Sequence, residues 1–213
     1  MLHLKNINIK IQKGACIAII GKIGSGKSSL LNCLFGELYA HTTRDSTPRI
    51  RLSTDRISYV AQTTWLQSRT IKENVVFYDD YDQARFDDAI ERSQMITDLA
   101  ELPGGEGTIL GDKGINLSGG QKVRLSLARA LYANQDIILM DDPISALDVK
   151  VGKTIMEDTI IGHLAGKTRV IVTHAISYLS FFDHIYIMED GAIVQEGDYE
   201  TIQKTDEYQA YAK

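Results

Sequence analysis

Apolar and polar residues follow one another along this chain in patterns that predict strands and helices. Between Leu2 and Ile11 the two kinds alternate, as in a strand with one buried face. Later apolar runs are continuous, which is typical of strands buried on both faces of a parallel sheet. Near the end, two strand patterns flank Asp190-Gly191, a common hairpin sequence. The predicted strands after the first cover residues 15–20, 57–61, 137–140, 169–173, 185–188 and 192–195.

Apolar residues at helical spacing fill the segments between these strands. Helix patterns cover residues 117–131 and 149–164, and Asp198 is placed to cap a last short helix. Strands that alternate with helices predict an α/β fold with a mainly parallel sheet. We therefore expect a single domain over residues 1–213, in which about residues 70–135 form an inserted α-helical lobe.

The composition is that of an ordinary soluble globular domain, with 44% apolar and 24% charged residues. The net charge of −5 does not suggest a nucleic-acid partner, since such proteins usually carry a basic face. Cys16 and Cys33 fit neither a metal-ligand spacing nor a disulfide framework, so we expect buried free thiols in a reducing compartment. No apolar run reaches the roughly 20 residues that span a bilayer, and Met1 leads into a strand pattern rather than a signal peptide.

Residues 41–56 are polar and turn-rich, with one proline and four arginines. Two interpretations of this segment stay open. It can be an ordinary solvated loop, or a variable hairpin or regulatory insertion.

The stretch GKIGSGKS at residues 21–28 fits the phosphate-binding loop G-x-x-x-x-G-K-[ST]. It follows the strand pattern at 15–20 and precedes a helix pattern, which is the context that the motif requires. Glycines let the backbone fold closely around phosphate oxygens, while Lys27 reaches the β- and γ-phosphates and the Ser28 hydroxyl binds Mg²⁺. The candidate phosphate-binding residues are Gly21, Lys22, Ile23, Gly24, Ser25, Gly26, Lys27, Ser28 and Ser29.

Further motifs narrow the class of nucleotide-binding protein. The apolar strand at 137–140 ends in Asp141-Asp142, and carboxylates at the C-terminal end of such a strand suit a nucleotide site. Together with Gln62 and His174, the segments LSGGQ at 117–121 and SALD at 145–148 follow in the order found in ABC transporters. Nearly the whole chain thus resembles the nucleotide-binding domain of an ABC transporter.

Two segments indicate a particular subfamily: the run VRLSLARA at residues 123–130 and the DDP at 141–143. Both are most similar to the first nucleotide-binding domain of the multidrug-resistance-associated (C) subfamily. The fold that the resemblance implies is a P-loop NTPase core with a mainly parallel sheet, a small antiparallel β subdomain and the helical lobe. The implied ligands are ATP and Mg²⁺.

The resemblance also implies roles for four residues around the γ-phosphate. Gln62 would contact Mg²⁺ and sense the γ-phosphate, Asp141 would hold Mg²⁺ directly or through water, and His174 would contact the γ-phosphate and the attacking water. Each has a purely structural alternative: a polar strand end, a helix N-cap and a structural histidine, respectively. Asp142 stands where most active relatives carry the glutamate that orients the water. Aspartate is one methylene shorter, so we expect this chain's own site to hydrolyse ATP slowly.

The segment at 117–121 is expected to act on a different nucleotide. Ser118 and the N–H groups of Gly119 and Gly120, followed by Gln121, lie at a helix N-terminus, which is a ready anion site. In the family this end completes the site of a second nucleotide-binding domain packed head-to-tail, so that two ATP molecules lie between the domains. Asp148 would lie in the loop that crosses this interface, or would simply cap a helix.

The same resemblance predicts partners and a location. The segment IKENVVF at residues 71–77 is similar to the one that meets transmembrane domains, with Phe77 as an exposed aromatic anchor; alternatively Phe77 fills the lobe's core. The domain would then work at the cytoplasmic face of a membrane. The aromatic residue that stacks on adenine would lie upstream of Met1, so we expect the natural polypeptide to be longer.

Other function classes stay open at this stage. A chromosome or DNA-repair ATPase of the same superfamily would carry a long coiled coil between the phosphate loop and residue 117. A soluble translation factor would need a second ATPase domain, and a non-hydrolysing ATP sensor is partly favoured by Asp142. The sequence does not identify a transported substrate, a membrane or a direction of transport.

Overall fold

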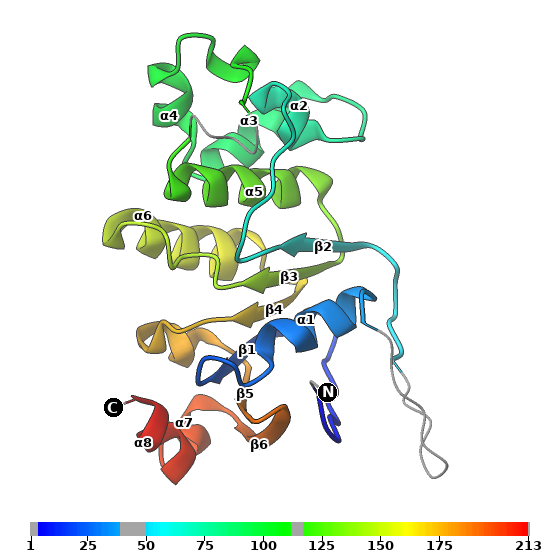
Figure 1. Cartoon of the computed structure of the whole chain (residues 1–213), viewed down its shortest axis with the longest axis vertical. Helices are drawn as coiled ribbons and strands as arrows, with labels where there is room; N and C mark the ends of the chain where they lie inside the picture. The colour runs from blue at the N-terminus through cyan, green and yellow to red at the C-terminus, as the bar shows by residue number, and fades with distance from the viewer. Residues whose placement is uncertain (1–3, 39–49, 112–116, 213) are drawn as a thin grey trace.

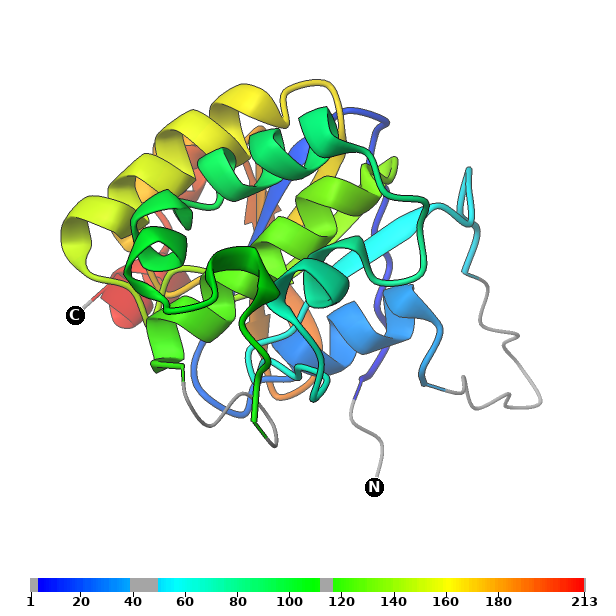
Figure 2. The same cartoon turned by 90° about the horizontal axis from the view of Figure 1, so that it is seen from above.

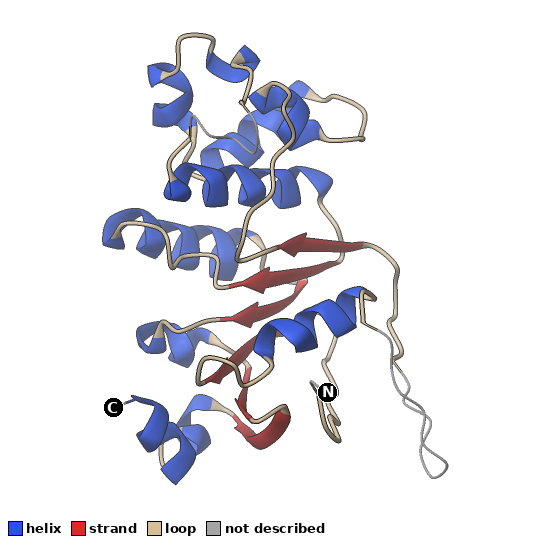
Figure 3. Ribbon diagram, in the orientation of Figure 1, coloured by secondary structure: helices blue, strands red, loops and turns tan. Residues whose placement is uncertain are grey.

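The chain folds around one six-stranded sheet, seen in a computed structural model that describes residues 4–38, 50–111 and 117–212. The strand order is β2-β3-β4-β1-β5-β6, and every neighbouring pair is parallel except β5 with β6. The strands form one layer, with helices above and beside it (Figure 3). They are β1 (Cys16–Gly21), β2 (Ile57–Val60), β3 (Ile137–Asp141), β4 (Thr168–Val172), β5 (His184–Glu189) and β6 (Ala192–Gly197).

Each face of the sheet has its own hydrophobic core, because successive side chains of a strand point to opposite sides. On one face, Ile17 and Ile19 of β1 pack with Leu30 and Leu31 of helix α1 (Lys27–Phe35). The other face packs against helix α6 (Val149–Thr154), its π-helical continuation η3 (Ile155–His163) and other helices. Viewed from above, α1 and the α6–η3 helix lie on opposite sides of the sheet (Figure 2). The predicted α/β class is therefore confirmed.

The predicted helical lobe is also present and lies beyond the β2 edge of the sheet (Figure 1). Thr70 caps its first helix with a reciprocal capping box. Buried apolar residues of the lobe, including Phe86, Met95 and Leu125, join the larger core. Its elements are α2 (Ile71–Val76), α3 (Gln83–Arg92), α4 (Ile96–Glu101), η1 (Gly105–Gly107) and α5 (Gly119–Ala133).

The C-terminal part adds a hairpin and short helices. Asp190 and Gly191 both have positive φ, 47° and 81°, as the two central residues of a type I′ hairpin turn require. The predicted cap at Asp198 is confirmed, since its Oδ1 accepts a 2.8 Å hydrogen bond from the Thr201 N–H. The remaining helices are η4 (Ile176–Phe181), α7 (Tyr199–Ile202) and α8 (Asp206–Ala212).

Two predictions for the N-terminal half need comment. The described part of the expected first strand, residues 4–11, is not a strand, although Ile7, Ile9 and Ile11 do pack against the sheet as the alternation predicted. The Lys5 N–H donates to the Gly191 carbonyl, and the Lys10 backbone hydrogen-bonds to Tyr186 of β5. The described residues show no separate antiparallel subdomain; their antiparallel pairing comprises β5 with β6 and an isolated bridge between Thr70 and Ile109. Most of the segment at 41–56 lies outside the described residues.

Candidate functional site

The ends of three neighbouring strands bring the candidate residues together. Asp141 of β3 is in register with Val172 of β4, and Val172 with Ile19 of β1. The bonding continues past the strands, because the Asp142 N–H donates to the Val172 carbonyl at 2.9 Å. Figure 1 shows the arrowheads of β2, β3 and β4 on one side of the sheet. The loop after β1, the two carboxylates after β3 and the histidine after β4 therefore share one edge.

The phosphate loop has the backbone that its glycines predict. Gly21, Gly24 and Gly26 have φ values of 146°, 82° and 100°, which residues with a Cβ rarely adopt. A Cβ on Gly21 would also collide with the Met188 carbonyl oxygen. Helix α1 then begins at Lys27, and no side chain caps its N-terminus. Its first N–H groups, at the positive end of the helix, are available to an anion.

Two buried side chains of this loop are suited to a phosphate. The Ser25 hydroxyl is buried and has no hydrogen-bond partner in the described structure. Lys27 is also buried, and its Nζ donates to the carbonyl oxygens of Gly21 at 2.8 Å and Lys22 at 2.9 Å. Burial lowers the pKa of Lys27, and the nearby charges of Asp141 and Asp142 partly oppose this. An anionic phosphate beside Lys27 would offset the cost of burying its charge.

Asp141 is the last residue of β3, and Asp142 follows it. Burial raises the pKa of Asp141, and the charge of Asp142 raises it further; a hydrogen bond from Ser28 and the charges of Lys27 and His174 act in the opposite direction. Asp142 does not continue the extended backbone of β3. Its φ is 53°, so the chain turns there instead of continuing as a strand.

The donor set suits Mg²⁺ bound together with a nucleotide. Ser28 hydrogen-bonds to Asp141, which provides a hydroxyl and a carboxylate side by side. Gln62 lies two residues beyond β2 and is exposed, so its amide oxygen can join them. Among the described residues there is no group of three or more His, Cys, Asp or Glu side chains that could hold a metal alone. Mg²⁺ commonly takes few protein ligands and completes its shell with phosphate oxygens and waters.

His174 follows β4 and its side chain is exposed at the same edge. Its Nδ1 lies 3.1 Å from the hydroxyl of Tyr211, which belongs to the C-terminal helix α8. This contact could not be predicted from the sequence, because the two residues are 37 positions apart and no motif includes Tyr211. The hairpin also supports the loop, since the Gly191 N–H donates to the Ser25 carbonyl at 2.9 Å.

The LSGGQ segment starts a second helix with different chemistry. The Ser118 hydroxyl accepts from the Gln121 N–H at 3.2 Å, and the Gln121 side chain accepts from the Ser118 N–H at 2.9 Å. Gln121 also donates to Asp98, which pairs with Arg124 at 2.9 Å. This capping network fixes the start of α5, while Ser118 and Gly119 stay exposed. In Figure 1, strands β2, β3 and β4 lie between α5 and the phosphate loop.

The loop after β3 connects the carboxylates with α5. The Ser145 hydroxyl donates to the Asp142 carbonyl at 3.0 Å. A Cβ on Gly120 would lie 3.1 Å from the Ala146 carbonyl oxygen, so the start of α5 packs closely on this loop. Asp148 caps α6 through a 3.0 Å bond from the Val151 N–H, which is the structural role we left open for it.

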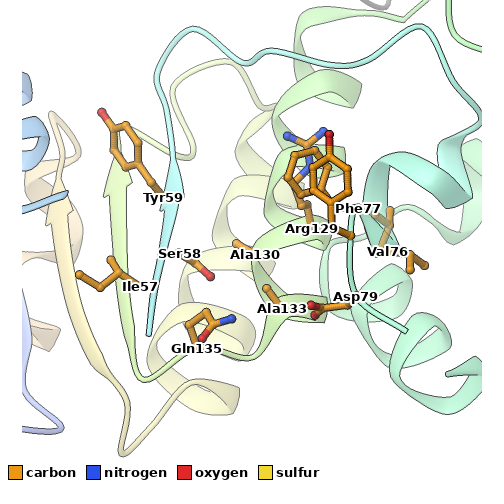
Figure 4. A pocket seen from close by; sticks show the side chains of 12 residues that line it. Ile57, Ser58, Tyr59, Val76, Phe77, Asp79, Arg129, Ala130, Ala133 and Gln135 are labelled. Carbon is orange, nitrogen blue, oxygen red and sulfur yellow. The ribbon is translucent and has the colours of Figure 1, made fainter. Parts of the chain in front are cut away.

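An aromatic pocket lies at the β2 edge, away from the nucleotide-binding loop. It has a volume of about 240 Å³ and is lined by β2, the end of α2 and α5 (Figure 4). Phe77 is only half-buried here, with its ring 5.5 Å from Trp65 and 4.3 Å from Tyr78. Trp65 and Tyr78 are 53% and 74% exposed. Phe77 is therefore neither a fully exposed anchor nor a core residue.

Arg129 of α5 lines this pocket and joins its parts. It donates to the carbonyl of Asn74 at 2.8 Å and to the Asn74 side chain at 3.0 Å, and its guanidinium lies 4.4 Å from the Trp65 ring. Burial lowers the pKa of Arg129 to about 10. The pocket thus connects the loop after β2 with the helix that starts at Ser118.

No helix in the described part of the chain is long and apolar enough to cross a membrane. Residues 4–145 match the ABC transporter family. The chain is 43% identical over 202 residues to ABC transporter C family member 8 of Dictyostelium discoideum, covering 93% of this chain and 12% of that protein. It is 44% identical over 205 residues to ATP-binding cassette sub-family C member 3 of Rattus norvegicus, covering 95% of this chain and 13% of that protein. It is 42% identical over 204 residues to human ATP-binding cassette sub-family C member 2, with coverage of 93% and 13%.

Proposed function

The chain belongs to the ABC transporter family, and from that premise we propose that it binds and hydrolyses ATP, and that ATP-dependent pairing with a second nucleotide-binding domain drives transport by an exporter. ABC domains are ATPases in general. The chain spans about an eighth of the C-family relatives it matches, 12–13% of their length, so transport is an activity that we propose for a longer protein. The observation that carries the proposal is the uncapped start of α1, where the orphan Ser25 hydroxyl and buried Lys27 lie beside two carboxylates.

The phosphates would bind to residues 21–29. The N–H groups at the start of α1 and the Ser25 hydroxyl would donate to their oxygens, and Lys27 would exchange its two backbone carbonyl partners for β- and γ-phosphate oxygens. Ser28, Asp141 and Gln62 would hold Mg²⁺, which neutralises charge on those oxygens.

The remaining site residues would act on the attacking water. His174 would donate a hydrogen bond toward the γ-phosphate, and Asp142 would orient the water. Aspartate reaches one methylene less far than glutamate, which supports slow hydrolysis at this chain's own site. ATP affinity does not depend on that methylene.

The second domain would pack on the edge that carries these residues. Ile23 and Val149 are 94% and 88% exposed, which is unusual for large apolar side chains. Ile23 lies in the phosphate loop, and Val149 is the first residue of α6, directly after its cap Asp148. With Ser118, Gly119 and Gly120 exposed or half-exposed at the start of α5, they provide an apolar and anion-binding surface for a matching domain.

Transmembrane domains would dock at the aromatic pocket, on the cytoplasmic face of the membrane. Phe77 and Tyr78 line this recess with a half-buried and an exposed ring, and the exposed Trp65 packs against Phe77, as in anchoring sites. We expect Phe77→Ser to reduce assembly of the full transporter without a large fall in the melting temperature of the isolated chain. Phe181→Ser, at an exposed phenylalanine outside the pocket, is the matched control.

Calorimetric titration with Mg-ATP tests the proposed function. Lys27→Ala removes charge-assisted hydrogen bonds worth a few kcal/mol, so we expect affinity to fall by about a hundredfold or more. Lys13→Ala, at an exposed lysine outside the loop, should leave affinity unchanged. Equal affinity of wild type and Lys27→Ala would refute the proposal.

One alternative retains support from a specific residue. Asp142 also suits a non-hydrolysing ATP sensor, which ATP turnover measured with and without a partner domain would identify. A chromosome-type ATPase is less well supported, because α3, the longest helix described between the phosphate loop and α5, has only ten residues.

A further inference from the structure

The C-terminal helix α8 contributes a side chain to the nucleotide-binding edge. The Tyr211 hydroxyl lies 3.1 Å from His174 Nδ1 and 3.4 Å from the Thr173 carbonyl oxygen, and the two rings are 6.3 Å apart. In Figure 1, α8 lies on the side to which the arrowheads of β2, β3 and β4 point. A tyrosine distant in sequence thus holds one nitrogen of the candidate γ-phosphate histidine.

This contact restricts what the imidazole can donate. A neutral histidine carries one ring proton, so one nitrogen donates and the other accepts. The Tyr211 hydroxyl has a single proton and two acceptors in reach, Nδ1 at 3.1 Å and the Thr173 carbonyl oxygen at 3.4 Å. When the hydroxyl donates to Nδ1, the shorter contact, the ring proton lies on Nε2; when it donates to Thr173, Nδ1 carries the ring proton and donates to the hydroxyl. Nε2 has no hydrogen-bond partner among the described residues, so it remains free to donate to an anion.

We propose that Tyr211 is a positioning residue, which fixes the His174 ring through Nδ1 and keeps the proton on Nε2, the nitrogen that faces the γ-phosphate. The inference rests on the proposed function and deepens it, because it explains how a neutral histidine presents a donor, not an acceptor, to an anion. The opposite tautomer would turn a lone pair toward the phosphate and repel it.

The surroundings of Tyr211 keep its hydroxyl protonated. Burial raises the pKa of Tyr211, and the charge of Asp142 raises it further, while the Gly21 backbone lowers it. The Tyr211 hydroxyl therefore interacts with the Gly21 backbone at the start of the phosphate loop, with the charge of Asp142 and with the His174 ring. A phenylalanine ring could fill the same space, but it has no hydroxyl to hydrogen-bond to the imidazole.

Nitrogen NMR of the histidine rings tests this directly in the nucleotide-free chain. At about pH 8, where imidazoles are mostly neutral, ¹⁵N spectra should show His174 with a protonated Nε2 and a hydrogen-bonded, unprotonated Nδ1. In Tyr211→Phe the Nδ1 signal should move to the position of a free acceptor. Tyr208→Phe removes a hydroxyl from the same helix, on a ring that packs near Tyr199, and should leave His174 unchanged. His174→Gln assigns the signal.

Two results would overturn the proposal: a wild-type spectrum with the proton on Nδ1, or an unchanged Nδ1 signal in Tyr211→Phe. In the assembled pair, Tyr211→Phe should lower kcat about fivefold at this chain's site, the size of one lost hydrogen bond, with KM for ATP unchanged. A fivefold rise in KM for ATP with no change in kcat would contradict a positioning role. Absence of ATP binding would refute the proposed function while leaving the NMR result intact, so the two failures are distinguishable.

Discussion

The starts of α1 and α5 are both suited to anions, but they are built in opposite ways. At α1 no side chain caps the helix, the Ser25 hydroxyl beside it has no partner, and Lys27 is buried. At α5 the Ser118 hydroxyl and the Gln121 side chain form a complete capping box that is tied to Asp98. At the first helix start no side chain accepts from the N–H groups, whereas at the second the Gln121 N–H already has a side-chain acceptor.

This difference explains how one chain can serve two nucleotides. An uncapped helix start with a buried lysine gains much from a bound phosphate, so it suits tight binding within the chain. A capped start is rigid and exposed, and it offers a hydroxyl and backbone N–H groups to a phosphate held elsewhere. The comparison therefore predicts that changes at α1 alter binding of this chain's ATP, and that changes at α5 alter turnover in the partner.

The largest effect is expected for Ser118→Arg in the assembled pair. The long side chain would occupy the place where the partner's γ-phosphate meets α5, so fast turnover at the partner's site should fall by at least about a hundredfold. Lys122→Arg, in the first turn of the same helix, is the matched control and should leave turnover at the partner's site unchanged. Single-site turnover measurements with ATP still bound to this chain provide the readout. If Ser118→Arg retains fast turnover, the start of α5 is not part of the partner's nucleotide site.

A smaller gain is expected for Asp142→Glu. The added methylene carries the carboxylate to the water, so turnover at this chain's own site should rise about tenfold, or roughly 1.4 kcal/mol off the barrier. Because φ at this position is 53°, which aspartate tolerates better than glutamate, we also expect a modest loss of stability. Asp136→Glu makes the same change just before β3 as a control. Unchanged turnover of Asp142→Glu with ATP bound would show that the shorter reach of the aspartate carboxylate does not limit hydrolysis.

The smallest effects are in the stability of the nucleotide-free chain. Ser118→Ala removes a cap and should lower the free energy of unfolding by about 1 kcal/mol. Ser25→Ala removes a buried hydroxyl that has no partner, so it should be neutral or slightly stabilising. Urea unfolding of both variants provides the measurement. If Ser25→Ala destabilises the chain as much as Ser118→Ala, the contrast between the two helix starts is wrong.

Features encoded by neighbouring residues could be predicted from the sequence. The loop at 21–28 needs glycines at fixed positions, and the buried strand at 137–140 is a continuous apolar run. The same holds for the Asp190-Gly191 turn and the cap at Asp198. In each case the local sequence restricts the backbone or satisfies its hydrogen bonds, so no distant residue is needed to infer the structure.

Features that depend on distant contacts could not be predicted. Residues 4–11 show strand alternation, but pairing depends on a neighbouring strand that the pattern does not specify. The chain turns at Asp142, where φ is 53°, and the run of apolar residues before it does not indicate this turn. The half-burial of Phe77 follows from the neighbouring rings of Trp65 and Tyr78. The Tyr211–His174 contact requires α8 to fold back to the strand ends.

The central claim is that α1 and α5 of this chain serve different nucleotides in a head-to-tail pair. Sedimentation velocity of the chain mixed with a second, matching nucleotide-binding domain tests it most directly, with Mg²⁺ and a non-hydrolysable ATP analogue present or absent. We predict a monomeric chain without nucleotide, a pair with the analogue, and weaker pairing in both Lys27→Ala and Ser118→Arg. Pairing that is equally strong without nucleotide, or that survives Ser118→Arg unchanged, would contradict the account.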